Sequence, residues 1–495
     1  MSKIAPPVPR VKSSSAAPGI ENIPGDYLLI LAAGNFPAGK VLAHELRSLV
    51  QSRRKSKGTH AGSLTPATAT IAGKLVVWAD WDAAASPFAQ QTAMRKAFEP
   101  LLKECPGEIA IVMHADAGGD ECASLAIYVA AVNSQYQLGR LTSKKADGHA
   151  ALHTIHLFGA GKSFSAAHAL AVAGGNLLAR KLALRPPNDL TPARYRSDVA
   201  KLAAAEGWKR KEYSYKALLK MGAGAFCAVA QGSPQQDAAI VHLSYVPKQR
   251  TKHLASISLV GKGICMDTGG HGLKSAKGMY GMHEDMSGSA VVLGIVKAAS
   301  ELQLPVAIDA WLAIAQNHLS PAAYQPGDIV TALDGTTIEV VHTDAEGRMV
   351  LADTLTLAAK LKPALMLDFA TLTGAMIYSL GTRMSGVFSN EADLAQRAIA
   401  GGVESGERAV LFPLDDDYDA ALDSKVADIK QCLIAGEADA IYAARFLSRF
   451  VGKVPWIHMD LSANRHEGGL GAVSDDLTGF GVAWGVRQLE KQIGQ

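Results

Sequence analysis

The sequence contains two clusters of charged residues, each placed where an apolar run ends. The first comprises Lys262, Asp267, Lys274 and, after a glycine-containing loop, Asp285. The second occupies residues 344–348, with the sequence Asp-Ala-Glu-Gly-Arg. Ligands of open α/β sheets bind outside the carboxyl ends of strands, so both clusters are expected at that edge of a sheet.

The acidic residues of the two clusters are predicted to hold metal ions. Several carboxylates in one small volume cannot all remain ionised and buried unless a multivalent cation compensates them. Four acids suit two divalent ions: Asp267, Asp285, Asp344 and Glu346. Two such ions about 3.5–4 Å apart share a bridging oxygen and lower the pKa of bound water to roughly 7, which yields a metal-bound hydroxide as the nucleophile.

The basic residues of the clusters have different expected roles. Lys262 lies inside an apolar strand, where desolvation and a nearby cation favour the neutral amine, which can then ligate a metal. Lys274 and Arg348 add positive charge where an oxyanion would develop. These two residues are therefore expected to polarise an oxygen or to hold an anion.

Each cluster also has a purely structural interpretation. Thr343 and Glu346 match the capping box that begins many helices, and Asp285 could cap the helix that follows it. Neither interpretation explains why Lys262 lies inside a strand or why further basic residues lie close by.

The first part of the chain alternates short apolar runs with helix-like patterns, which is typical of parallel strands joined by crossover helices. Residues 1–25 are rich in Pro, Ser and Ala and are expected to form a flexible tail. An N-terminal α/β domain is predicted over residues 26–162, and residues 163–185 are expected to form one long linking helix. The predicted strands are residues 27–32, 75–79, 109–114 and 151–158.

The prolines at 186 and 187 must end the linking helix, so a C-terminal catalytic domain is predicted over residues 186–495. Apolar residues at helical spacing predict a helix shortly after Asp285. Asp334-Gly335 is a two-residue hairpin signal, and the second hairpin strand leads directly to Asp344. Further strands are predicted at residues 238–245, 254–266, 306–315, 365–371 and 456–461. The expected fold is α/β, with two domains that each contain a mixed or mostly parallel sheet flanked by helices.

Composition and charge limit the class of protein. The chain has 495 residues, 48% of them hydrophobic and 19% charged, which is typical of a globular protein with more than one core. The net charge of +3 and the scattered basic residues argue against a nucleic-acid-binding surface, and the basic run at residues 53–57 is interpreted as a solvated loop. Five isolated cysteines favour a reducing compartment. No apolar stretch is long enough to span a bilayer, so we expect a soluble, cytoplasmic protein.

Together these motifs closely resemble the signatures of the leucyl aminopeptidase family, also known as the cytosol aminopeptidases. The likeness is strongest from residue 178 to residue 460 and is weaker before that stretch. Besides the charged clusters, it includes residues 185–192 (Arg-Pro-Pro-Asn-Asp-Leu-Thr-Pro), 324–328 (Tyr-Gln-Pro-Gly-Asp), 368–374 (Asp-Phe-Ala-Thr-Leu-Thr-Gly) and 446–450 (Phe-Leu-Ser-Arg-Phe).

The resemblance implies an aminopeptidase with two divalent metal ions per subunit, Zn²⁺ or Mn²⁺, with Mg²⁺ as a further option. One metal would be ligated by Lys262, Asp267, Asp285 and Glu346. The other would be ligated by Asp267, Asp344 and Glu346. The free α-amine of a peptide substrate would also ligate a metal, which would restrict cleavage to the N-terminus.

The same resemblance implies roles for residues around the metals. Lys274 would stabilise the gem-diolate intermediate, and Arg348 would anchor a bicarbonate ion that serves as general base. Met282, Thr371 and Gly374 would line the pocket for the first side chain. A homohexamer is expected by the same resemblance.

Two departures from the family pattern and two other functions leave alternatives open. His283 and His342 replace residue types usual in the family and could alter metal preference or pH optimum. Residues 463–477 depart most from the usual pattern near the pocket, so the preferred first residue is not implied. A dipeptidase such as a cysteinylglycine hydrolase is one alternative function, and a non-catalytic scaffold or DNA-binding member of the family is another.

Overall fold

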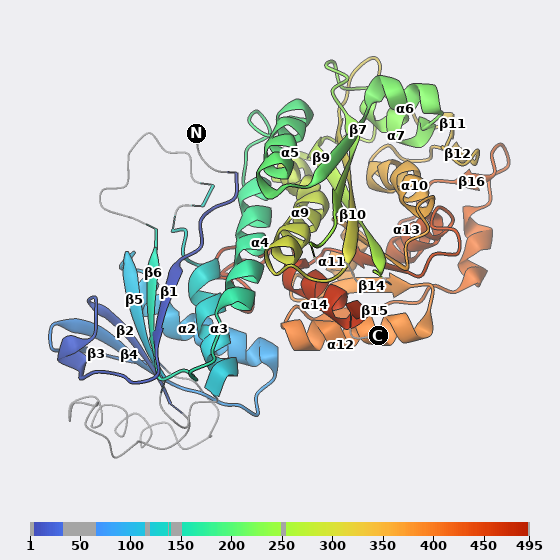
Figure 1. Ribbon diagram of the computed structural model, residues 1–495. Coiled ribbons are helices and arrows are strands. Elements are labelled where there is room, and N and C mark those ends of the chain that lie inside the picture. The colour runs from blue at the N-terminus through green and yellow to red at the C-terminus, as the bar shows by residue number, and fades with distance from the viewer. Residues whose placement is uncertain are drawn as a thin grey trace. The chain divides into compact units, whose positions relative to one another are not determined.

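The computed structural model describes residues 4–32, 66–113, 119–136, 138–139, 151–248 and 254–493. The chain divides into two compact units, whose elements are labelled in Figure 1. The N-terminal unit comprises Pro6–Gly174 and Glu467–Asp476, and the C-terminal unit comprises chiefly Gly175–His466 and Leu477–Gln495. The basic run at residues 53–57 lies outside the described residues.

The N-terminal unit is built on a six-stranded sheet of strand order β1-β6-β5-β2-β4-β3. Neighbouring strands are parallel except for β3, which is antiparallel to β4. The strands are β1 (Arg10–Ser14), β2 (Tyr27–Ala32), β3 (Ala67–Ile71), β4 (Lys74–Asp80), β5 (Glu108–Met113) and β6 (Thr154–Phe158). The helices are the 3-10 turn η1 (Ile20–Asn22), α2 (Pro87–Leu102) and α3 (Gly119–Val132), and α4 (Ala167–Ala183) leads into the C-terminal unit.

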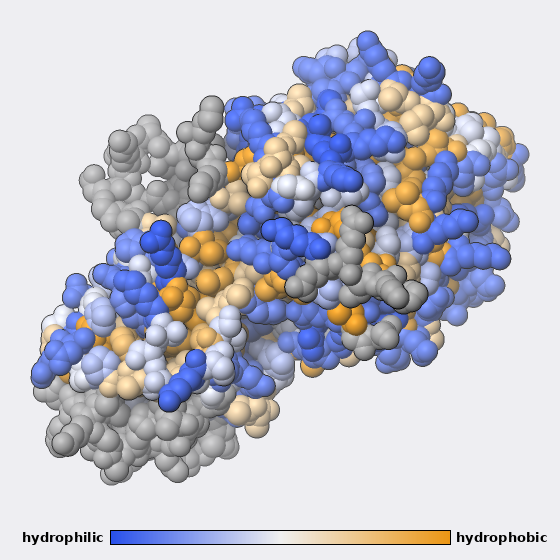
Figure 2. Space-filling view, viewed as in Figure 1, coloured by the Kyte–Doolittle hydropathy of each residue, from blue (hydrophilic) through white to orange (hydrophobic). Residues whose placement is uncertain are grey.

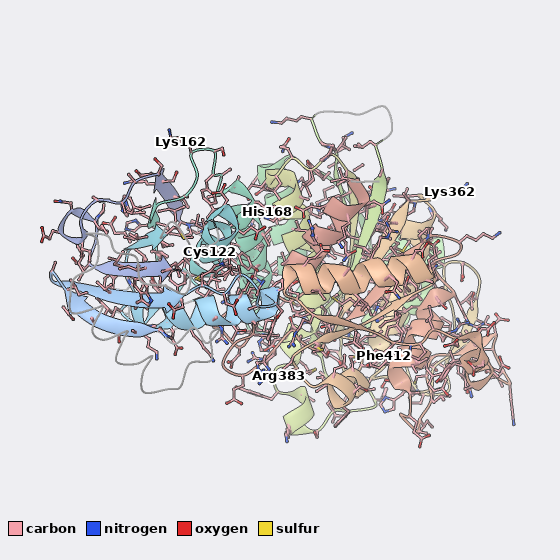
Figure 3. The ribbon with its side chains drawn as sticks, turned by 90° about the horizontal axis from the view of Figure 1, so that it is seen from below. Cys122, Lys162, His168, Lys362, Arg383 and Phe412 are labelled. Atoms are coloured by element: carbon pink, nitrogen blue, oxygen red, sulfur yellow. The ribbon has the colours of Figure 1, made fainter. Side chains whose placement is uncertain are left out.

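Alternating strand residues bury apolar clusters on both faces of this sheet. Leu29 and Leu31 of β2 pack with residues of α2 and α3, whereas Leu28 and Ile30 belong to a separate cluster. Figure 3 shows Cys122 of α3 inside this unit, where it is fully buried. All five cysteines are free thiols, in keeping with their isolated positions in the sequence.

Two parts of the predicted domain division differ from the structure. Residues 10–14, predicted as part of a flexible tail, form β1, which pairs in parallel with β6. The tail is rich in proline, but residues 10–14 contain none, so their backbone donors can join a sheet edge.

Residues 467–476, predicted as part of the catalytic domain, belong to the N-terminal unit. Ala472 and Val473 are buried in its core. The side chain of Asn133 donates to the carbonyl of Ala472 and accepts from the backbone nitrogen of Ser474, both over 2.8 Å. These contacts explain why the segment belongs to the N-terminal unit, although the residues before and after it belong to the C-terminal unit.

The C-terminal unit contains an eight-stranded sheet of order β15-β14-β17-β13-β9-β10-β8-β7. The central strands β17, β13, β9 and β10 are parallel, whereas β14 and β8 run antiparallel to their central neighbours. The strands are β7 (Lys209–Ser214), β8 (Ala239–Tyr245), β9 (Ser256–Asp267), β10 (Ala307–Asn317), β13 (Leu365–Ala370), β14 (Ser385–Ser389), β15 (Ala409–Leu411) and β17 (Trp456–Asp460). A small sheet of order β11-β12-β16 comprises β11 (Ile329–Thr331), β12 (Thr337–Glu339) and β16 (Ile429–Lys430).

Helices cover both faces of the large sheet, as Figure 1 shows for α9 and α10 on either side of β10. The helices are α5 (Pro192–Glu206), α6 (Tyr215–Met221), α7 (Gly224–Ala230), α8 (Ala276–Met279), α9 (Ser287–Glu301), α10 (Glu346–Ala359), α11 (Gly374–Leu380), α12 (Ala392–Ser405), α13 (Asp439–Ser448) and α14 (Val482–Ile493), with the 3-10 turns η2 (Met282–Met286) and η3 (Asp416–Leu422). Hydrophilic side chains predominate along the outer edge of this unit in Figure 2. None of the described helices is both long and apolar enough to cross a membrane.

The α/β fold class predicted from the sequence is confirmed, and each strand predicted in the second half appears within a few residues of its expected bounds. Strands β7, β14 and β15 of the large sheet were not predicted. The hairpin at Asp334-Gly335 forms between β11 and β12. The last bond between its arms runs from the backbone nitrogen of Ala332 to the carbonyl of Thr336, so the turn between these residues is longer than the predicted two residues.

Gly288, the second residue of α9, lets the start of this helix lie directly against the sheet. A Cβ atom added there would lie 2.1 Å from the carbonyl oxygen of Phe369 in β13 and 3.0 Å from the backbone nitrogen of Lys262 in β9. Both atoms belong to central strands in a close-packed interior, which has little freedom to yield. The missing side chain therefore brings η2, and with it Asp285, next to β9.

Gly288→Ala is expected to destabilise the C-terminal unit by about 2–3 kcal/mol, as overpacked cores do. Urea unfolding followed by fluorescence of the buried tryptophans, such as Trp311 and Trp456, measures this change. Gly374→Ala is the matched control, because a Cβ atom there meets no atom within 4 Å. The control should change the free energy of unfolding by less than about 0.5 kcal/mol. Equal unfolding midpoints for the two variants would contradict the packing argument.

Candidate metal centre

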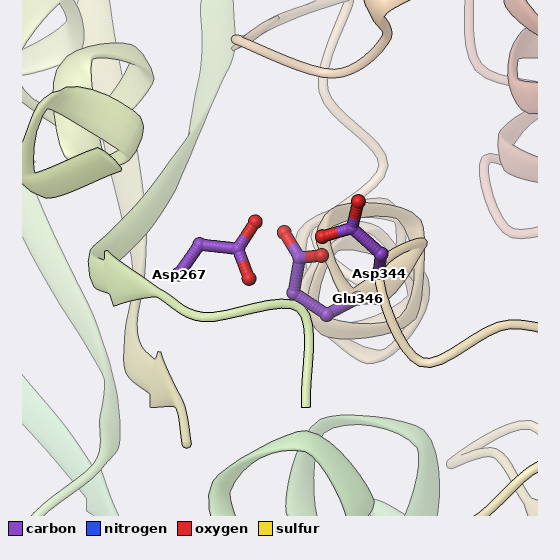
Figure 4. Close-up of side chains that lie close together, drawn as sticks. All are labelled: Asp267, Asp344 and Glu346. Carbon is purple, nitrogen blue, oxygen red and sulfur yellow. The ribbon is translucent and has the colours of Figure 1, made fainter. Parts of the chain in front are cut away.

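The residues of the two charged clusters converge at the carboxyl end of β9. Lys262 and Asp267 lie on β9, Asp285 lies in η2, and Glu346 is the first residue of α10, two residues after Asp344. Figure 4 shows the carboxylates of Asp267, Asp344 and Glu346 turned toward one another. One ligand oxygen from each of these three lies within 4.8 Å of the other two.

Strand alternation directs Lys262 toward α10. Val260 and Ile264, two residues to either side of Lys262, belong to the apolar cluster that α10 shares, so Lys262 points to the same face. Gly347, in the first turn of α10, gives it room, because a Cβ atom there would lie 2.7 Å from both Cε and Nζ of Lys262. The lysine is 3% exposed, and its ammonium reaches the acids at the helix start.

Buried polar side chains fix the positions of Asp267 and Asp344. Asn317, the last residue of β10, donates to Asp267 Oδ1 over 2.8 Å and to the carbonyl of Thr343 over 2.9 Å. The hydroxyl of Tyr324 donates to the same carbonyl over 2.8 Å. Thr343 Oγ1 donates to the carbonyl of Gly269 over 2.7 Å, which ties the loop after β9 to the turn before α10.

Thr371, just after β13, fixes the remaining acid. Its hydroxyl donates to Asp285 Oδ1 over 2.6 Å, and its carbonyl accepts from Lys262 Nζ over 2.9 Å. Asp460, at the end of β17, accepts from the backbone nitrogen of Leu372 over 3.1 Å and from the hydroxyl of Thr373 over 2.7 Å. The loop after β13 is therefore held from both sides.

The two lysines neutralise the acids only in part. Lys262 Nζ lies 2.8 Å from both Asp285 Oδ2 and Glu346 Oε1. Lys274 Nζ lies 2.8 Å from Asp267 Oδ2 and 2.5 Å from Asp344 Oδ1. When all are ionised, four carboxylates face two ammonium groups, which leaves two negative charges in a largely buried volume. Hard oxygen donors with this excess charge fit divalent cations.

The shifted pKa values of the acids reflect this crowding. Burial, with the neighbouring carboxylates, raises the pKa of Asp285 to about 8, although Lys262 opposes the shift. Burial and the charge of Asp267 raise the pKa of Asp344 to about 6 and also raise that of Glu346. The ionised form of these carboxylates is therefore disfavoured, so a cation bound among them would be strongly favoured.

Without a metal the ammonium form of Lys262 is favoured, whereas the sequence predicts the neutral amine beside a bound cation. Burial alone would lower its pKa, but the carboxylates of Asp285, Glu346 and Asp267 outweigh burial and raise the pKa above the ordinary lysine value. The same balance holds the pKa of Lys274 above its ordinary value. A neutral Lys262 therefore requires a bound cation close enough to reverse the field of the acids.

The structural interpretations of the two clusters are wrong. The N-cap residue of α10 is Ala345 and that of α9 is Met286, and neither makes a side-chain capping hydrogen bond. Thr343 is engaged with the loop after β9 instead of closing a capping box, and Asp285 lies inside η2. The acids are thus not explained as helix caps.

Arg348 lies in α10 and is 2% exposed. Its Nη2 donates to Asp439 Oδ1 over 2.7 Å, and its Nη1 donates to the carbonyl of Gln431 over 3.2 Å. Burial would lower the pKa of Arg348, but the carboxylate of Asp439 raises it. The guanidinium is charged and lines the cavity beside the acids, so its role in holding an anion stays a prediction.

A cavity of about 540 Å³ opens beside the acids within the C-terminal unit. Met282, Thr371 and Gly374, the predicted pocket residues, all line it, as do Lys262, Lys274 and the four acids. His342 also lines it, with its Nδ1 accepting from the backbone nitrogen of Asp344 over 3.1 Å. His283 is not among the lining residues.

Several residues that organise the site were not predicted. Gln431 donates to the carbonyl of Ala345 over 3.0 Å and accepts from the backbone nitrogens of Val341 and His342, and no local pattern marks it. Asp460 could have been found, because it ends a predicted strand at the edge of the sheet where ligands bind. Glu284 and Arg465, which also line the cavity, are far apart in sequence, and their pairing has no local signal.

Comparison with known proteins agrees with this geometry. Residues 177–485 match the cytosol aminopeptidase family, catalytic domain. A probable cytosol aminopeptidase of Stutzerimonas stutzeri is 44% identical over 336 residues, which cover 67% of each chain. One of Acidovorax is 42% identical over 327 residues, covering 66% of this chain and 64% of its own. The alignments thus span about two thirds of the length of these curated relatives.

Two solved structures share the fold over nearly the whole chain. A mutant of tomato leucine aminopeptidase superimposes with a TM-score of 0.85 at 26% identity, covering 98% of this chain and 97% of its own. The bottromycin maturation enzyme, solved in complex with Mn, has a TM-score of 0.79 at 29% identity, covering 94% of this chain and 99% of its own. The chain therefore belongs to the cytosol aminopeptidase family, whose members are aminopeptidases.

Proposed function

We propose that this protein is a two-metal aminopeptidase that removes the N-terminal residue from peptides. The observation that carries the proposal is the excess of buried and half-buried carboxylates over ammonium groups beside the cavity. Family membership supports the reaction class, and the Mn complex of a structural neighbour supports a divalent metal. A homohexamer belongs to the same proposal by resemblance alone, and a cytoplasmic location belongs to it on the composition of the chain.

The acids would divide between two cations as the resemblance implies. Lys262, Asp267, Asp285 and Glu346 would hold one, and Asp267, Asp344 and Glu346 the other. Two divalent cations, Zn²⁺ or Mn²⁺ in the first instance, would supply Lewis acidity and a water of lowered pKa. The oxygen-rich donor set leaves Mg²⁺ as a further option.

Lys274 and Arg348 would act on the substrate carbonyl and its surroundings. Lys274 lies between Asp267 and Asp344 with its ammonium at the cavity, where it can stabilise negative charge that develops on the carbonyl oxygen. Arg348 would hold an anion such as bicarbonate that accepts a proton, and Asp439 keeps its guanidinium in place. Met282, Thr371 and Gly374 would surround the first side chain.

Asp344→Asn is expected to lower aminopeptidase activity by at least about 100-fold, since it removes one negative charge from a metal ligand set. The measurement is kcat/KM on a panel of dipeptides, cysteinylglycine included, and on aminoacyl anilides, with and without added Mn²⁺ or Zn²⁺. Asp334→Asn is the control, because it makes the same change at the exposed tip of the hairpin. Full activity in Asp344→Asn would refute the assignment of this residue.

Lys262→Met tests whether lysine and metal are alternative counter-charges to the same acids. Without metal, the variant should lose about 3–5 kcal/mol of stability, because Asp285 and Glu346 lose a buried partner. Added Mn²⁺ or Zn²⁺ should recover part of this loss and should stabilise the wild-type protein by about 2.7 kcal/mol at a concentration 100 times the Kd. The midpoint of thermal unfolding, measured with chelator and with metal, reports both effects.

Lys297→Met is the control for this experiment. Lys297 pairs with Glu206 over 3.4 Å and with Glu301 over 3.2 Å away from the cavity. Its loss should cost no more than about 1 kcal/mol, as for other ion pairs near the surface. A thermal midpoint that does not respond to metal in the wild-type protein would overturn the metal centre itself.

A further inference from the structure

Glu284 and Arg465 form an ion pair in the wall of the cavity. Arg465 Nε lies 3.0 Å from Glu284 Oε2 and 3.1 Å from Oε1, and its Nη2 lies 2.5 Å from Oε1. The carboxylate is 12% exposed, whereas the arginine side chain is 49% exposed. Glu284 is therefore largely committed to Arg465, and the arginine is the partner that remains accessible.

The pair lies beside the residues proposed to surround the first side chain of a peptide. Glu284 follows Met282 by two residues in η2 and directly precedes Asp285. Arg465 is the last residue of the segment from Asp460 that contributes to the cavity lining. Glu284 and Arg465 line the same cavity as Thr371 and Gly374. The pair therefore contributes charged groups to the cavity that the first side chain is proposed to enter.

The backbone holds Arg465 at a defined place. Arg465 forms an isolated antiparallel bridge with Leu477, at the point where the chain returns from the excursion of residues 467–476. The carbonyl of Ala463, two residues before Arg465, accepts a hydrogen bond from the hydroxyl of Thr478 over 2.7 Å. The bidentate contact of Arg465 with Glu284 then fixes the plane of the guanidinium. The guanidinium of Arg465 is thus held in a defined position in the cavity lining.

Other polar residues continue this wall. Ser462 and Asn464 line the cavity on the same stretch of chain as Arg465, and Thr382 lines it with its hydroxyl 2.7 Å from Nδ1 of His466. Apolar lining comes from Met282, Leu372 and Ile377, among others. The cavity lining therefore includes both polar and apolar side chains.

The chemistry of the pair decides which side chains it suits. An aliphatic side chain pressed against it would remove water from two charges without supplying a hydrogen bond, which costs free energy. A carboxamide or carboxylate oxygen can accept from the guanidinium, which has five N–H donors. A site built to bond a polar group discriminates strongly against an analogue that lacks this group.

We propose that the Glu284–Arg465 pair makes this cavity select peptides whose first residue carries a carboxamide or carboxylate, over aliphatic residues of equal size. The inference rests on the proposed aminopeptidase function and names its substrate class. It also makes Arg465 the residue that determines specificity, while Glu284 positions it.

The test is kcat/KM of the metal-loaded, full-length protein on dipeptides that differ only in the first residue. Gln against Met and Asn against Leu are pairs of nearly equal size. The wild-type protein should prefer Gln and Asn by at least about tenfold, which corresponds to about 1.4 kcal/mol. Arg465→Leu should reverse this preference and should raise the relative rate for Lys, because the carboxylate of Glu284 then faces the cavity alone.

Two further variants keep the test decisive. The double variant Glu284→Gln/Arg465→Met removes both charges together, so it avoids an unpaired buried carboxylate, and it should favour Met over Gln. Arg487→Leu is the matched control, since it breaks an Arg–Glu pair with Glu404 outside the cavity lining and should leave the Gln to Met ratio unchanged.

The outcomes separate the two proposals. A wild-type protein that releases Met and Leu faster than Gln and Asn would overturn the inference alone. An unchanged Gln to Met ratio in both Arg465 variants would overturn it as well. A metal-loaded protein that releases no first residue from any peptide would overturn the proposed function, and the inference with it.

Discussion

Excess negative charge in a buried volume is the constraint on which the rest of this structure depends. Two lysines cannot balance four carboxylates, and burial raises the pKa of Asp285 and Asp344 because the protein solvates their charges poorly. Uncompensated buried charge of this kind costs free energy. A bound cation would offset this cost, and the hard oxygen donors at the end of the central strand suit a divalent metal, in keeping with the Mn complex of a structural neighbour.

Close backbone packing lets the fold bring the cluster together. Gly347 makes room for Lys262, and Gly288 brings η2 against β9 and β13. Around these contacts, neutral hydrogen bonds from Asn317, Tyr324 and Gln431 fix the loops that carry the acids without adding charge. Neutral groups suit this task, because further charge would compete with metal for the same carboxylates.

The sequence predicted the central architecture and the acids because both have strong local signals. Apolar runs that end in charged residues mark parallel strands and the edge where ligands bind, and β9 with Lys262 and Asp267 is the clearest case. Strands β14 and β15 are short, and β14 pairs with β17, which lies far away in sequence. The place of residues 467–476 was missed for the same reason, since their apolar residues pack into a core that begins hundreds of positions earlier.

The pKa of Lys262 depends on more than its burial. The sequence predicts a buried lysine beside a cation, and both burial and the cation favour a neutral amine. The sign of the net shift depends on how many carboxylates lie within a few ångströms, and three of them outweigh burial here. Residue type and burial can be read from a strand pattern, but the balance of fields is a property of the folded site.

The turn η2 contains both a proposed metal ligand, Asp285, and a residue of the proposed selectivity pair, Glu284. In a 3-10 helix, residues three apart lie on the same side, so Met282 and Asp285 share one edge while Glu284 points elsewhere, toward Arg465. A change in the turn that altered the pocket would therefore also move a proposed metal ligand. Arg465 lies in a separate segment, so a change at this position does not alter the turn that carries Asp285. Selectivity can change at residue 465 while Asp285 stays in place, which makes the partner from the second segment the freer of the two to vary.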